Sequence, residues 1–255
     1  MCTTCGCGEP DLKSTVLLPG EELVLPEENP NPSYDSMQRV IDLHQDIMHH
    51  NYHGAEKNRE FFRNRNILCL NLVSSPGSGK TSLLEALLRE SYDFPSYVIE
   101  GDQQTFNDAA RIDALKIPVA QINTGKGCHL DAEMVKNALD KLNPVHDSLL
   151  YIENVGNLVC PAMFDLGEEY RIVIASVTEG EDKPIKYPDM FESAQLCVLN
   201  KVDLLPYLNF NVEKFREYAL MVNPNIEFLA TAATQDEGVG NLKEWILNKK
   251  ELVCA

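Results

Sequence analysis

The segment SSPGSGKT, residues 74–81, most strongly constrains what this chain can fold into. It continues the apolar run ILCLNLVS and leads into SLLEALLRE, a run whose leucines recur at helical spacing. A glycine-rich turn between a buried strand and a helix N-terminus presents backbone N–H groups to phosphate. The order of strand, turn and helix therefore predicts a phosphate-binding loop in an α/β domain.

The residue types of this loop match the pattern G-x-x-x-x-G-K-[ST] except at its first position, where Ser74 replaces glycine. We treat that change as a tolerated variation, because the rest of the pattern is intact. Lys80 is predicted to reach the outer phosphates and to act in catalysis, and the Thr81 hydroxyl to bind Mg²⁺. The predicted nucleotide contacts of the loop are Gly77, Ser78, Gly79, Lys80, Thr81 and Ser82.

The fragment LNKVD, at the end of a later apolar run, indicates which base is bound. Asn200, Lys201 and Asp203 form N-K-x-D, in which a carboxylate can accept hydrogen bonds from N1–H and the 2-amino group of guanine. Adenine does not offer those donors in that arrangement. With the phosphate loop before it in the chain, the tetrapeptide predicts GTP and GDP as ligands. Residues 231–238, TAATQDEG, loosely resemble the S-A-K-type loop of GTPases and are a candidate for a further guanine-side loop.

Two loops between these anchors are expected to sense the γ-phosphate. The second predicted strand ends in EGDQQTFND, where Asp102 is predicted to ligate or orient Mg²⁺ and to act in catalysis, with Thr105 and Asp108 nearby. The fourth ends in IENVGNLVCP, where Glu153, a third predicted catalytic residue, begins a loop whose Gly156 can approach a phosphate closely. The alternative is that both are ordinary strand-end turns.

Short apolar runs alternate with helical stretches after Asn66, which is typical of repeated βα units. Seven runs are predicted strands, namely ILCLNLVS, SYVIEG, PVAQIN, SLLYIEN, RIVIASVT, AQLCVLN and IEFLAT. We expect a doubly wound, mostly parallel α/β sheet forming a P-loop GTPase domain over residues 66–255. A helix over residues 36–65 is expected to pack on it, preceded by a flexible metal-binding tail over residues 1–35.

Charge restricts the partners. The chain has 22 Lys and Arg against 39 Asp and Glu, and a net charge of −17 argues against nucleic acid or an anionic membrane and suits cations. No apolar run approaches the roughly 20 residues that span a bilayer, and the start lacks the pattern of a signal peptide, so we expect a cytoplasmic protein.

Eight cysteines could form four disulfides, but a reducing compartment and a chain of 255 residues disfavour that. Cys69 and Cys197 lie in apolar strand-like runs, where a buried, unreactive thiol is the favoured interpretation. Cys254, next to the end, is uninformative. The remaining five are in loops that contain glycine or proline.

Cys128 and His129 are adjacent in NTGKGCHLDAE, and Cys160 follows Gly156 by four residues. Thiolate and imidazole together suit Zn²⁺, Ni²⁺ or copper. Neighbouring residues face apart on regular elements, so one ion can be shared only at an irregular turn, which the adjacent glycines permit. Three side chains leave a four-coordinate ion one ligand short, so a symmetric dimer sharing ions is a natural completion. A buried Cys128 with a surface His129 stays the alternative.

Three thiols open the chain as MCTTCGC, at Cys2, Cys5 and Cys7. Such a group on a flexible tail can close on one soft or borderline ion with little folding. A redox pair is the rival, but it would normally open a helix beside a strand, whereas this group precedes residues 8–34, which contain five prolines and six acidic side chains. The histidines of the following helix could add ligands, although a solvated helix face is favoured for His44, His49, His50 and His53.

In this order, SSPGSGKT, EGDQQTFND, TGKGCHLDA, IENVGNLVCP and NKVD behind MCTTCGC closely resemble the hydrogenase nickel-incorporation GTPases, the HypB family. The resemblance covers about residues 36–250 and the N-terminal thiols. The chain is similar to the urease-accessory GTPases too, but those carry a Cys-Pro-His pattern where this chain has Cys128 directly followed by His129.

The resemblance implies a GTP-promoted homodimer that helps deliver nickel to the large-subunit precursor of nickel–iron hydrogenase, with the zinc-containing chaperone HypA. It makes Cys2, Cys5 and Cys7 a tight nickel site, and the set Cys128, His129 and Cys160 a zinc or nickel site. Some members carry a histidine-rich tract that stores nickel, and this chain lacks it.

Two other functions stay open from the sequence. A nickel or zinc buffer in which GTP only stabilises the dimer would use the same residues, and a small-molecule kinase is disfavoured by the N-K-x-D motif. Leu204 and Leu208, one helical turn apart, could form a dimer contact, but a core position is slightly preferred.

Overall fold

The computed structural model describes residues 34–90, 92–102, 107–125 and 127–254, without the side chains of 34–47, 107 and 254. The thiols of the tail, Cys2, Cys5 and Cys7, lie outside the described residues, as do Thr105 and the side chain of His44. The chain forms two compact units, Met1–His50 and Asn51–Ala255. Helix α1 (Tyr34–Asn64) crosses that boundary, and the predicted division at residues 35 and 65 stays a prediction. The second unit contains all seven strands of the described residues.

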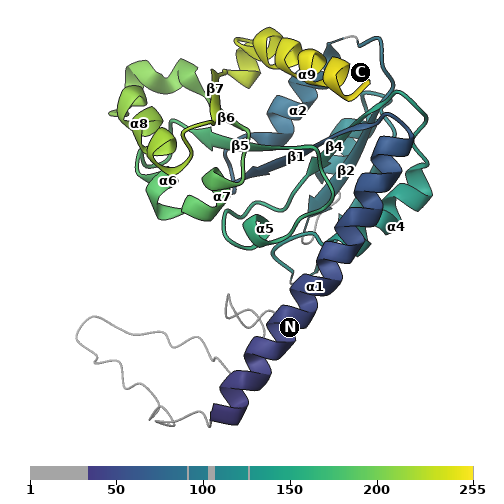
Figure 1. Ribbon diagram of the computed structural model, residues 1–255. Coiled ribbons are helices and arrows are strands. Elements are labelled where there is room, and N and C mark those ends of the chain that lie inside the picture. Colours follow the sequence, from purple (N-terminus) through teal and green to yellow (C-terminus); the bar gives the residue numbers. More distant parts are fainter. Residues whose placement is uncertain (1–33, 91, 103–106, 126, 255) are drawn as a thin grey trace. The chain divides into compact units, whose positions relative to one another are not determined.

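A seven-stranded sheet forms the centre of this unit, in the order β3-β2-β4-β1-β5-β6-β7 (Figure 1). All six pairings of neighbouring strands are parallel. The strands are β1 (Leu68–Ser74), β2 (Ser96–Asp102), β3 (Val119–Asn123), β4 (Leu149–Glu153), β5 (Tyr170–Ser176), β6 (Leu196–Asn200) and β7 (Glu227–Ala230). Every predicted strand is present, so the doubly wound α/β prediction is confirmed.

Helices connect successive strands on both faces of the sheet, as parallel strands require. The connecting helices are α2 (Lys80–Arg89), α3 (Asn107–Asp113), α4 (Ala132–Leu142), α5 (Cys160–Met163), α6 (Lys183–Lys186), α7 (Pro188–Glu192) and α8 (Val212–Val222), with the 3₁₀ turn η1 (Val202–Tyr207). The 3₁₀ turn η2 (Ala233–Gln235) and helix α9 (Val239–Cys254) follow the last strand, β7. None of the helices in the described ranges is both long and apolar enough to cross a membrane.

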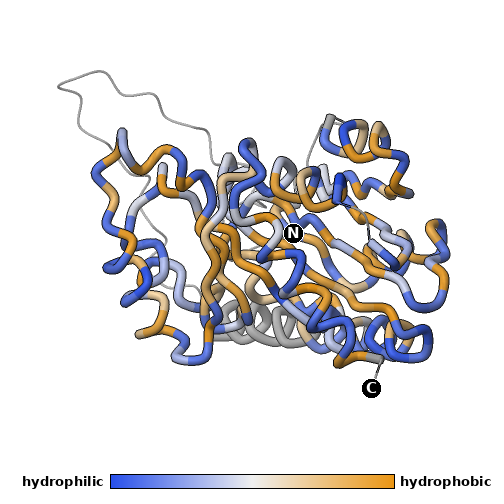
Figure 2. Tube along the Cα trace, turned by 90° about the horizontal axis from the view of Figure 1, so that it is seen from above, coloured by the Kyte–Doolittle hydropathy of each residue, from blue (hydrophilic) through white to orange (hydrophobic). Residues whose placement is uncertain are grey.

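The core has two layers, because successive side chains of a strand point to opposite faces. Leu70 of β1 belongs to a cluster with leucines of α2 and α9, whereas Val73 packs with Phe191 and Phe215 on the other face. Figure 2 shows the strands as a mainly hydrophobic centre between more hydrophilic loops and helix surfaces.

The thiols of Cys69 and Cys197 are fully buried in this core, and burial raises the pKa of both. The predicted buried position of both thiols is confirmed, and a buried thiol that holds its proton is a poor nucleophile. Leu204 is half-buried and packs against the core, as preferred from the sequence, but Leu208 is 39% exposed in the single chain, so a core position is wrong for it.

The strand order brings the functional loops together. β4 lies between β1 and β2, and the carboxyl ends of parallel strands share one edge of the sheet. The loops after β1, β2 and β4 therefore meet at that edge, although they are separated by up to about 80 residues in the sequence.

Replacing Leu70 by alanine is expected to lower the free energy of unfolding by about 2–5 kcal/mol, since the side chain is fully buried in the central strand. The matched change Leu252→Ala removes a leucine that is 66% exposed on α9, and should alter stability by no more than about 0.5 kcal/mol. Urea unfolding followed by circular dichroism measures both. Equal losses would contradict the assignment of β1 to the core.

Candidate functional site

The loop after β1 wraps the N-terminus of α2, as the phosphate-loop prediction requires. Gly77 (φ 75°) and Gly79 (φ 95°) adopt left-handed backbone conformations that side chains disfavour. A Cβ on Gly79 would lie 2.6 Å from Nδ2 of Asn200, so this position also lacks space for a side chain. The loop opens into a cavity of about 480 Å³, lined by Pro76, Gly77, Ser78, Gly79, Lys80, Thr81, Ser82, Glu100, Gly101, Asp102, Asp108, Arg111, Glu153, Asn154, Gly156 and Lys201.

Glu153, at the end of β4, contacts the two loop side chains that were predicted to act on phosphate and Mg²⁺. The Thr81 hydroxyl donates to its Oε1 at 2.7 Å, and the ammonium of Lys80 lies 3.8 Å from the same oxygen. All three side chains line the cavity. The structure thus brings Lys80, Thr81 and Glu153 together, as their places after neighbouring strands suggest.

Three carboxylates converge in this cavity. Glu100, Asp108 and Glu153 each offer an oxygen, and these oxygens lie within 4.8 Å of one another. Glu100 and Glu153 are register partners on β2 and β4, and each is only 2% exposed. Among the described residues, the Oε2 atoms of both have no hydrogen-bond partner.

This crowding changes the ionisation of both glutamates. Burial, followed by the neighbouring Glu153 carboxylate, raises the pKa of Glu100 to about 10. Burial also raises the pKa of Glu153, against the opposing effect of Lys80. Adjacent, desolvated carboxyl groups with orphan oxygens are what a hard divalent cation such as Mg²⁺ would satisfy, so the residues present fit that ion.

Glu100 was missed from the sequence, where Asp102 was singled out instead. Asp102 lines the cavity two residues further along β2 but is not a member of the carboxylate cluster, so its Mg²⁺ role stays a prediction. Glu100 could have been found from the pairing of β2 with β4. An acidic residue on β2 that lies opposite Glu153 must point to the same face of the sheet.

The guanine-side motif joins two loops to the phosphate loop. Asn200 is buried, and its Nδ2 donates to Ser78 O at 3.0 Å, while its Oδ1 accepts from the Thr231 hydroxyl at 3.1 Å and from Ala233 N at 3.2 Å. Lys201 donates to Gly77 O at 2.7 Å. The segment 231–238 therefore lies against N-K-x-D, beside the phosphate loop.

Asp203, the predicted base-reading residue, lies in η1. Its Oδ2 accepts from Nε2 of Gln235 at 3.4 Å, which places the carboxylate next to the 231–238 segment. The guanine contacts of Asn200, Lys201 and Asp203 remain predictions.

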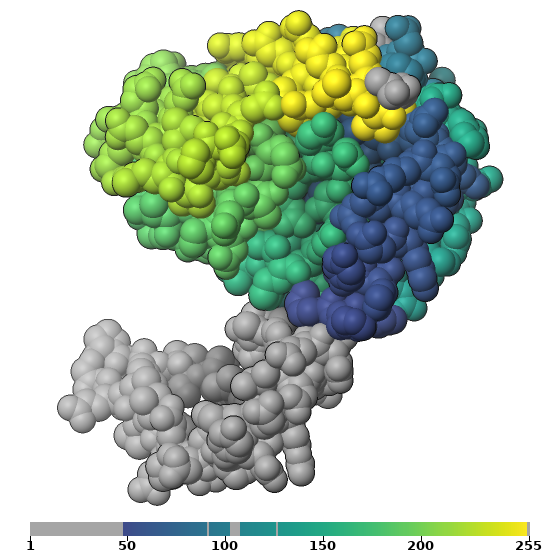
Figure 3. All heavy atoms as spheres, viewed as in Figure 1, coloured from purple at the N-terminus to yellow at the C-terminus, as the bar shows by residue number. Residues whose placement is uncertain are grey.

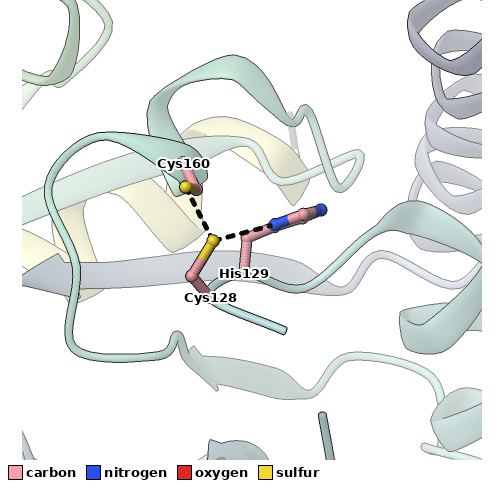
Figure 4. Close-up of side chains that lie close together, drawn as sticks. All are labelled: Cys128, His129 and Cys160. Atoms are coloured by element: carbon pink, nitrogen blue, oxygen red, sulfur yellow. Dashed lines mark hydrogen bonds between the residues drawn. The ribbon is translucent and has the colours of Figure 1, made fainter. Parts of the chain in front are cut away.

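A second cluster brings together Cys128, His129 and Cys160 (Figure 4). Their ligand atoms lie within 4.8 Å of one another, with the two sulfurs 2.7 Å apart and Cys128 Sγ 3.7 Å from Nδ1 of His129. Cys160 is fully buried and Cys128 is 6% exposed. Cys128 is buried, as the alternative also requires, and His129 is half-buried with its Nδ1 near the thiols, so the geometry favours a shared site, which stays a prediction.

An irregular turn makes this arrangement possible, as predicted. Gly125 has φ 60° and donates its N–H to the side chain of Asn123, while Gly127 donates its N–H to Thr124 O. Cys128 and His129 follow in neither helix nor strand. Two soft sulfurs and an imidazole fit Zn²⁺ or Ni²⁺ better than Mg²⁺.

The imidazole is fixed from its other side. The His129 ring stacks on Phe164 with centroids 3.8 Å apart, and burial lowers its pKa despite the nearby Asp131. A neutral imidazole is the form that binds metal, so this environment favours ligation near neutral pH.

Two asparagines of α1 form hydrogen bonds with the segments that follow Cys128, His129 and Cys160 in the chain. Figure 3 shows the described end of α1, in dark blue, lying against the teal part of the domain. Asn51 accepts from Ala132 N at 2.9 Å and donates to Asp165 O at 2.8 Å. Asn58 donates to Ala132 O at 2.9 Å and to Leu166 O at 3.0 Å. Both asparagines are buried, so α1 holds the two arms of the cluster at a fixed separation.

Three histidines of α1 have described side chains. His49, His50 and His53 are solvent-exposed, and within the described ranges the metal-type groups are the two already given. Their exposure agrees with the predicted solvated helix face, and whether they ligate a metal stays untested.

Known proteins share both the sequence and the fold. A model of the "CobW/HypB/UreG, nucleotide-binding domain" matches residues 68–230. The hydrogenase maturation factor HypB of Escherichia coli K12 is 47% identical over an alignment 284 positions long, which covers 96% of this chain and 98% of that relative. The HypB of Azotobacter vinelandii is 56% identical over 83% of this chain and 70% of its own length.

This chain belongs to the HypB family of hydrogenase maturation factors. The crystal structure of HypB from Helicobacter pylori in complex with nickel agrees with it at a TM-score of 0.75 and 37% identity, covering 79% of this chain and 95% of that one. HypB from Archaeoglobus fulgidus gives a TM-score of 0.72 and 38% identity, over 80% and 98%. Membership confirms the resemblance found in the motifs and a nucleotide-binding domain.

The buried carboxylates predict a pH dependence. In the metal-free and nucleotide-free protein, Glu100 keeps its proton up to about pH 10, whereas in the unfolded chain it loses it near pH 4.5. The folded state therefore binds more protons between these values, and stability falls as pH rises. Glu100→Gln removes this effect and should raise the free energy of unfolding more at pH 8 than at pH 5, because the penalty grows as pH rises above the pKa of the unfolded chain.

Thermal or urea unfolding in EDTA at the two pH values measures this. Glu213→Gln, on the exposed surface of α8, is the control and should give the same small change at both. A Glu100→Gln effect that does not grow with pH would contradict the account of this cavity.

Proposed function

We propose that this HypB-family chain is a GTP-hydrolysing nickel metallochaperone that assists nickel insertion into the large subunit of nickel–iron hydrogenase. The carrying observation is that one short loop, residues 153–160, begins with Glu153 in the nucleotide cavity and ends with Cys160 in the sulfur cluster. A change at the phosphate end of this loop must be absorbed within eight residues, the last of which is a predicted metal ligand.

Nucleotide binding and hydrolysis would follow from the phosphate loop. Its backbone N–H groups and the N-terminus of α2 would hold the phosphates of GTP, with Lys80 placed to neutralise charge on the outer ones. Thr81, Glu153 and Glu100 would hold Mg²⁺, and Asp102 lines the same cavity. When bound, that ion supplies charge neutralisation between the β- and γ-phosphates.

Guanine selection is assigned to the N-K-x-D motif. Asn200 and Lys201 tie the base-side loops to the phosphate loop, so a base held there would have a fixed distance to its phosphates. Asp203 would accept from N1–H and the 2-amino group of guanine, an arrangement of donors that adenine lacks.

The cluster of Cys128, His129 and Cys160 would hold zinc or nickel. Three ligands leave a four-coordinate ion incomplete, so we propose a GTP-promoted homodimer that completes the site. The tail thiols Cys2, Cys5 and Cys7 are proposed as a separate, tighter nickel site. Nickel is the cargo in both cases, and the nickel complex of the Helicobacter pylori HypB supports binding of that ion within the family.

The nucleotide would control the metal affinity of the Cys128, His129 and Cys160 cluster through the 153–160 loop. Gly156 packs so closely on the phosphate loop that a Cβ would lie 3.1 Å from Cα of Pro76. Movement of the phosphate loop would therefore push on this segment, and Cys160 would move with it.

The proposed partners are the hydrogenase large-subunit precursor and a zinc-containing chaperone of the HypA type, in the cytoplasm. Family membership supports a place in hydrogenase maturation. A nickel or zinc buffer in which GTP only stabilises the dimer is the competing function. One test distinguishes the two functions. If the protein is only a buffer, hydrogenase maturation would persist in a variant that binds GTP without hydrolysing it.

Lys80→Ala is expected to remove GTP turnover, at least a 100-fold loss of kcat, because its ammonium lines the cavity and is proposed to contact the outer phosphates. Nickel binding by the tail thiols should be unchanged, since these are predicted to act separately. Phosphate release and Ni²⁺ titration of the same preparation measure the two properties. Turnover at the normal rate would overturn the assignment of the phosphate loop.

Asp203→Ala should weaken GTP binding by about 10- to 100-fold, the worth of hydrogen bonds to a charged acceptor. Binding of ATP, which does not use this carboxylate, should not change. Competition between labelled GDP and unlabelled GTP or ATP measures the ratio. A parallel loss for both nucleotides would instead indicate a structural role for Asp203 at the 231–238 loop.

A further inference from the structure

Asn71 is a polar side chain in the middle of the buried central strand, in LCLNLVS, and it is fully buried. A buried amide needs partners, because desolvation without them is costly. Its Nδ2 donates to Oε1 of Glu168 at 2.9 Å, and its Oδ1 accepts from Nδ2 of Asn154 at 3.3 Å. Asn71 thus connects the segment that leaves β4 with the segment that leads into β5.

Asn154 directly follows Glu153 of the nucleotide cavity and lines that cavity itself. It is 1% exposed, its backbone N–H donates to Leu72 O, and its Oδ1 accepts from Val155 N. The Asn154 side chain must therefore move whenever the start of the 153–160 loop moves.

Arg171, the register partner of Asn71 on β5, forms the far end of the network. Its Nε and Nη2 donate to Oε1 of Glu168 at 3.0 and 2.7 Å, and its Nη1 donates to the Ser193 hydroxyl. Its remaining bonds go to Ala162 O at 3.2 Å and Phe164 O at 3.0 Å. All five N–H groups of the guanidinium are used, so its position is fixed by these partners.

Those two carbonyl groups belong to residues next to the cluster of Cys128, His129 and Cys160, called the metal cluster below. Ala162 lies in α5, the helix that starts at Cys160, and Phe164 follows it and stacks on His129. Glu168 is also tied to this region, since its Oε2 accepts from Leu166 N at 2.8 Å. A displacement of Arg171 would therefore shift the supports of both Cys160 and His129.

We propose that Asn154, Asn71, Glu168 and Arg171 form a buried relay of hydrogen bonds that transmits the state of the nucleotide cavity to the metal cluster. The proposal rests on the nucleotide control of metal binding proposed above and names the residues that carry it. All four are positioning residues, because none is among the three members of the metal cluster. The relay runs through the sheet, separately from the peptide chain of the 153–160 loop.

Burial is what makes this network able to transmit movement. A surface hydrogen bond that breaks is replaced by water, whereas a buried donor or acceptor left without a partner loses its full solvation. When Glu153 shifts on loss of the γ-phosphate and its cation, Asn154 shifts with it, and the Asn71 amide must follow or lose a partner. The same reasoning applies at Glu168 and Arg171, so the members move together.

The test is the ratio of Ni²⁺ dissociation constants measured with GDP and with a non-hydrolysable GTP analogue, both with Mg²⁺. It uses the full chain carrying Cys2→Ser, Cys5→Ser and Cys7→Ser, so that only the internal cluster is titrated. In this background we expect a ratio of about 5 to 100, the usual range of coupling between sites. Asn71→Ala should bring the ratio to within about twofold of one, while GTP binding persists.

Asn58→Ala is the matched control. It also removes a buried asparagine that supports the metal-binding segments, but from α1 instead of the relay. It should change the Ni²⁺ affinity by the same factor with either nucleotide and leave the ratio intact.

The outcomes separate the two proposals. A ratio of one in the unsubstituted relay background would overturn nucleotide control itself, and the relay with it. A normal ratio that survives Asn71→Ala would overturn the relay alone. If Asn71→Ala does not fold, as judged by circular dichroism, Arg171→Lys replaces it. That change keeps the charge opposite Glu168 but cannot supply all five N–H donors, and an undiminished ratio in it would overturn the relay equally.

Discussion

The buried carboxylate of Glu153 lies at the centre of the nucleotide cavity and begins the segment that ends at Cys160 of the second site. It accepts a hydrogen bond from Thr81, lies 3.8 Å from the ammonium of Lys80, and shares its surroundings with Glu100. Desolvation makes a charge at this position costly, so its state depends strongly on what else is bound in the cavity. Glu153 ends the strand that leads to Cys160, and this connection is the basis of the proposed control of metal binding by the nucleotide.

The order of strands in the sheet explains why the 153–160 loop reaches both the nucleotide cavity and the cluster of Cys128, His129 and Cys160. β4 lies between β1, which carries the phosphate loop, and β2, which carries Glu100. The segment leaving β4 must therefore pass the phosphate loop, and the close packing of Gly156 on Pro76 marks that crossing. Beyond it, α5 places Cys160 next to the turn that carries Cys128 and His129, and α1 holds the two arms together through Asn51 and Asn58.

Much of this could be predicted from the sequence, because the relevant signals are local. Apolar runs of strand length gave all seven strands, and the adjacency of Cys128 and His129 after two glycines required the irregular turn that is observed. What escaped prediction depends on pairing across the sheet. Glu100 matters because it lies opposite Glu153, and Asn71 because Asn154 and Glu168 meet it, and neither relation is visible in one stretch of sequence. Leu208 was misplaced for a related reason, since a spacing of four residues does not tell a buried face from an exposed one.

The central claim is that the bound nucleotide alters how Cys160 and its neighbours hold a metal. Nickel K-edge X-ray absorption tests this most directly, on the full chain with serine at positions 2, 5 and 7 and one equivalent of Ni²⁺, with GDP and with a non-hydrolysable GTP analogue. The account predicts a change in the number or distance of sulfur ligands between the two states. Superimposable spectra would contradict it, and would leave a nucleotide site and a metal site that share a loop without influencing each other.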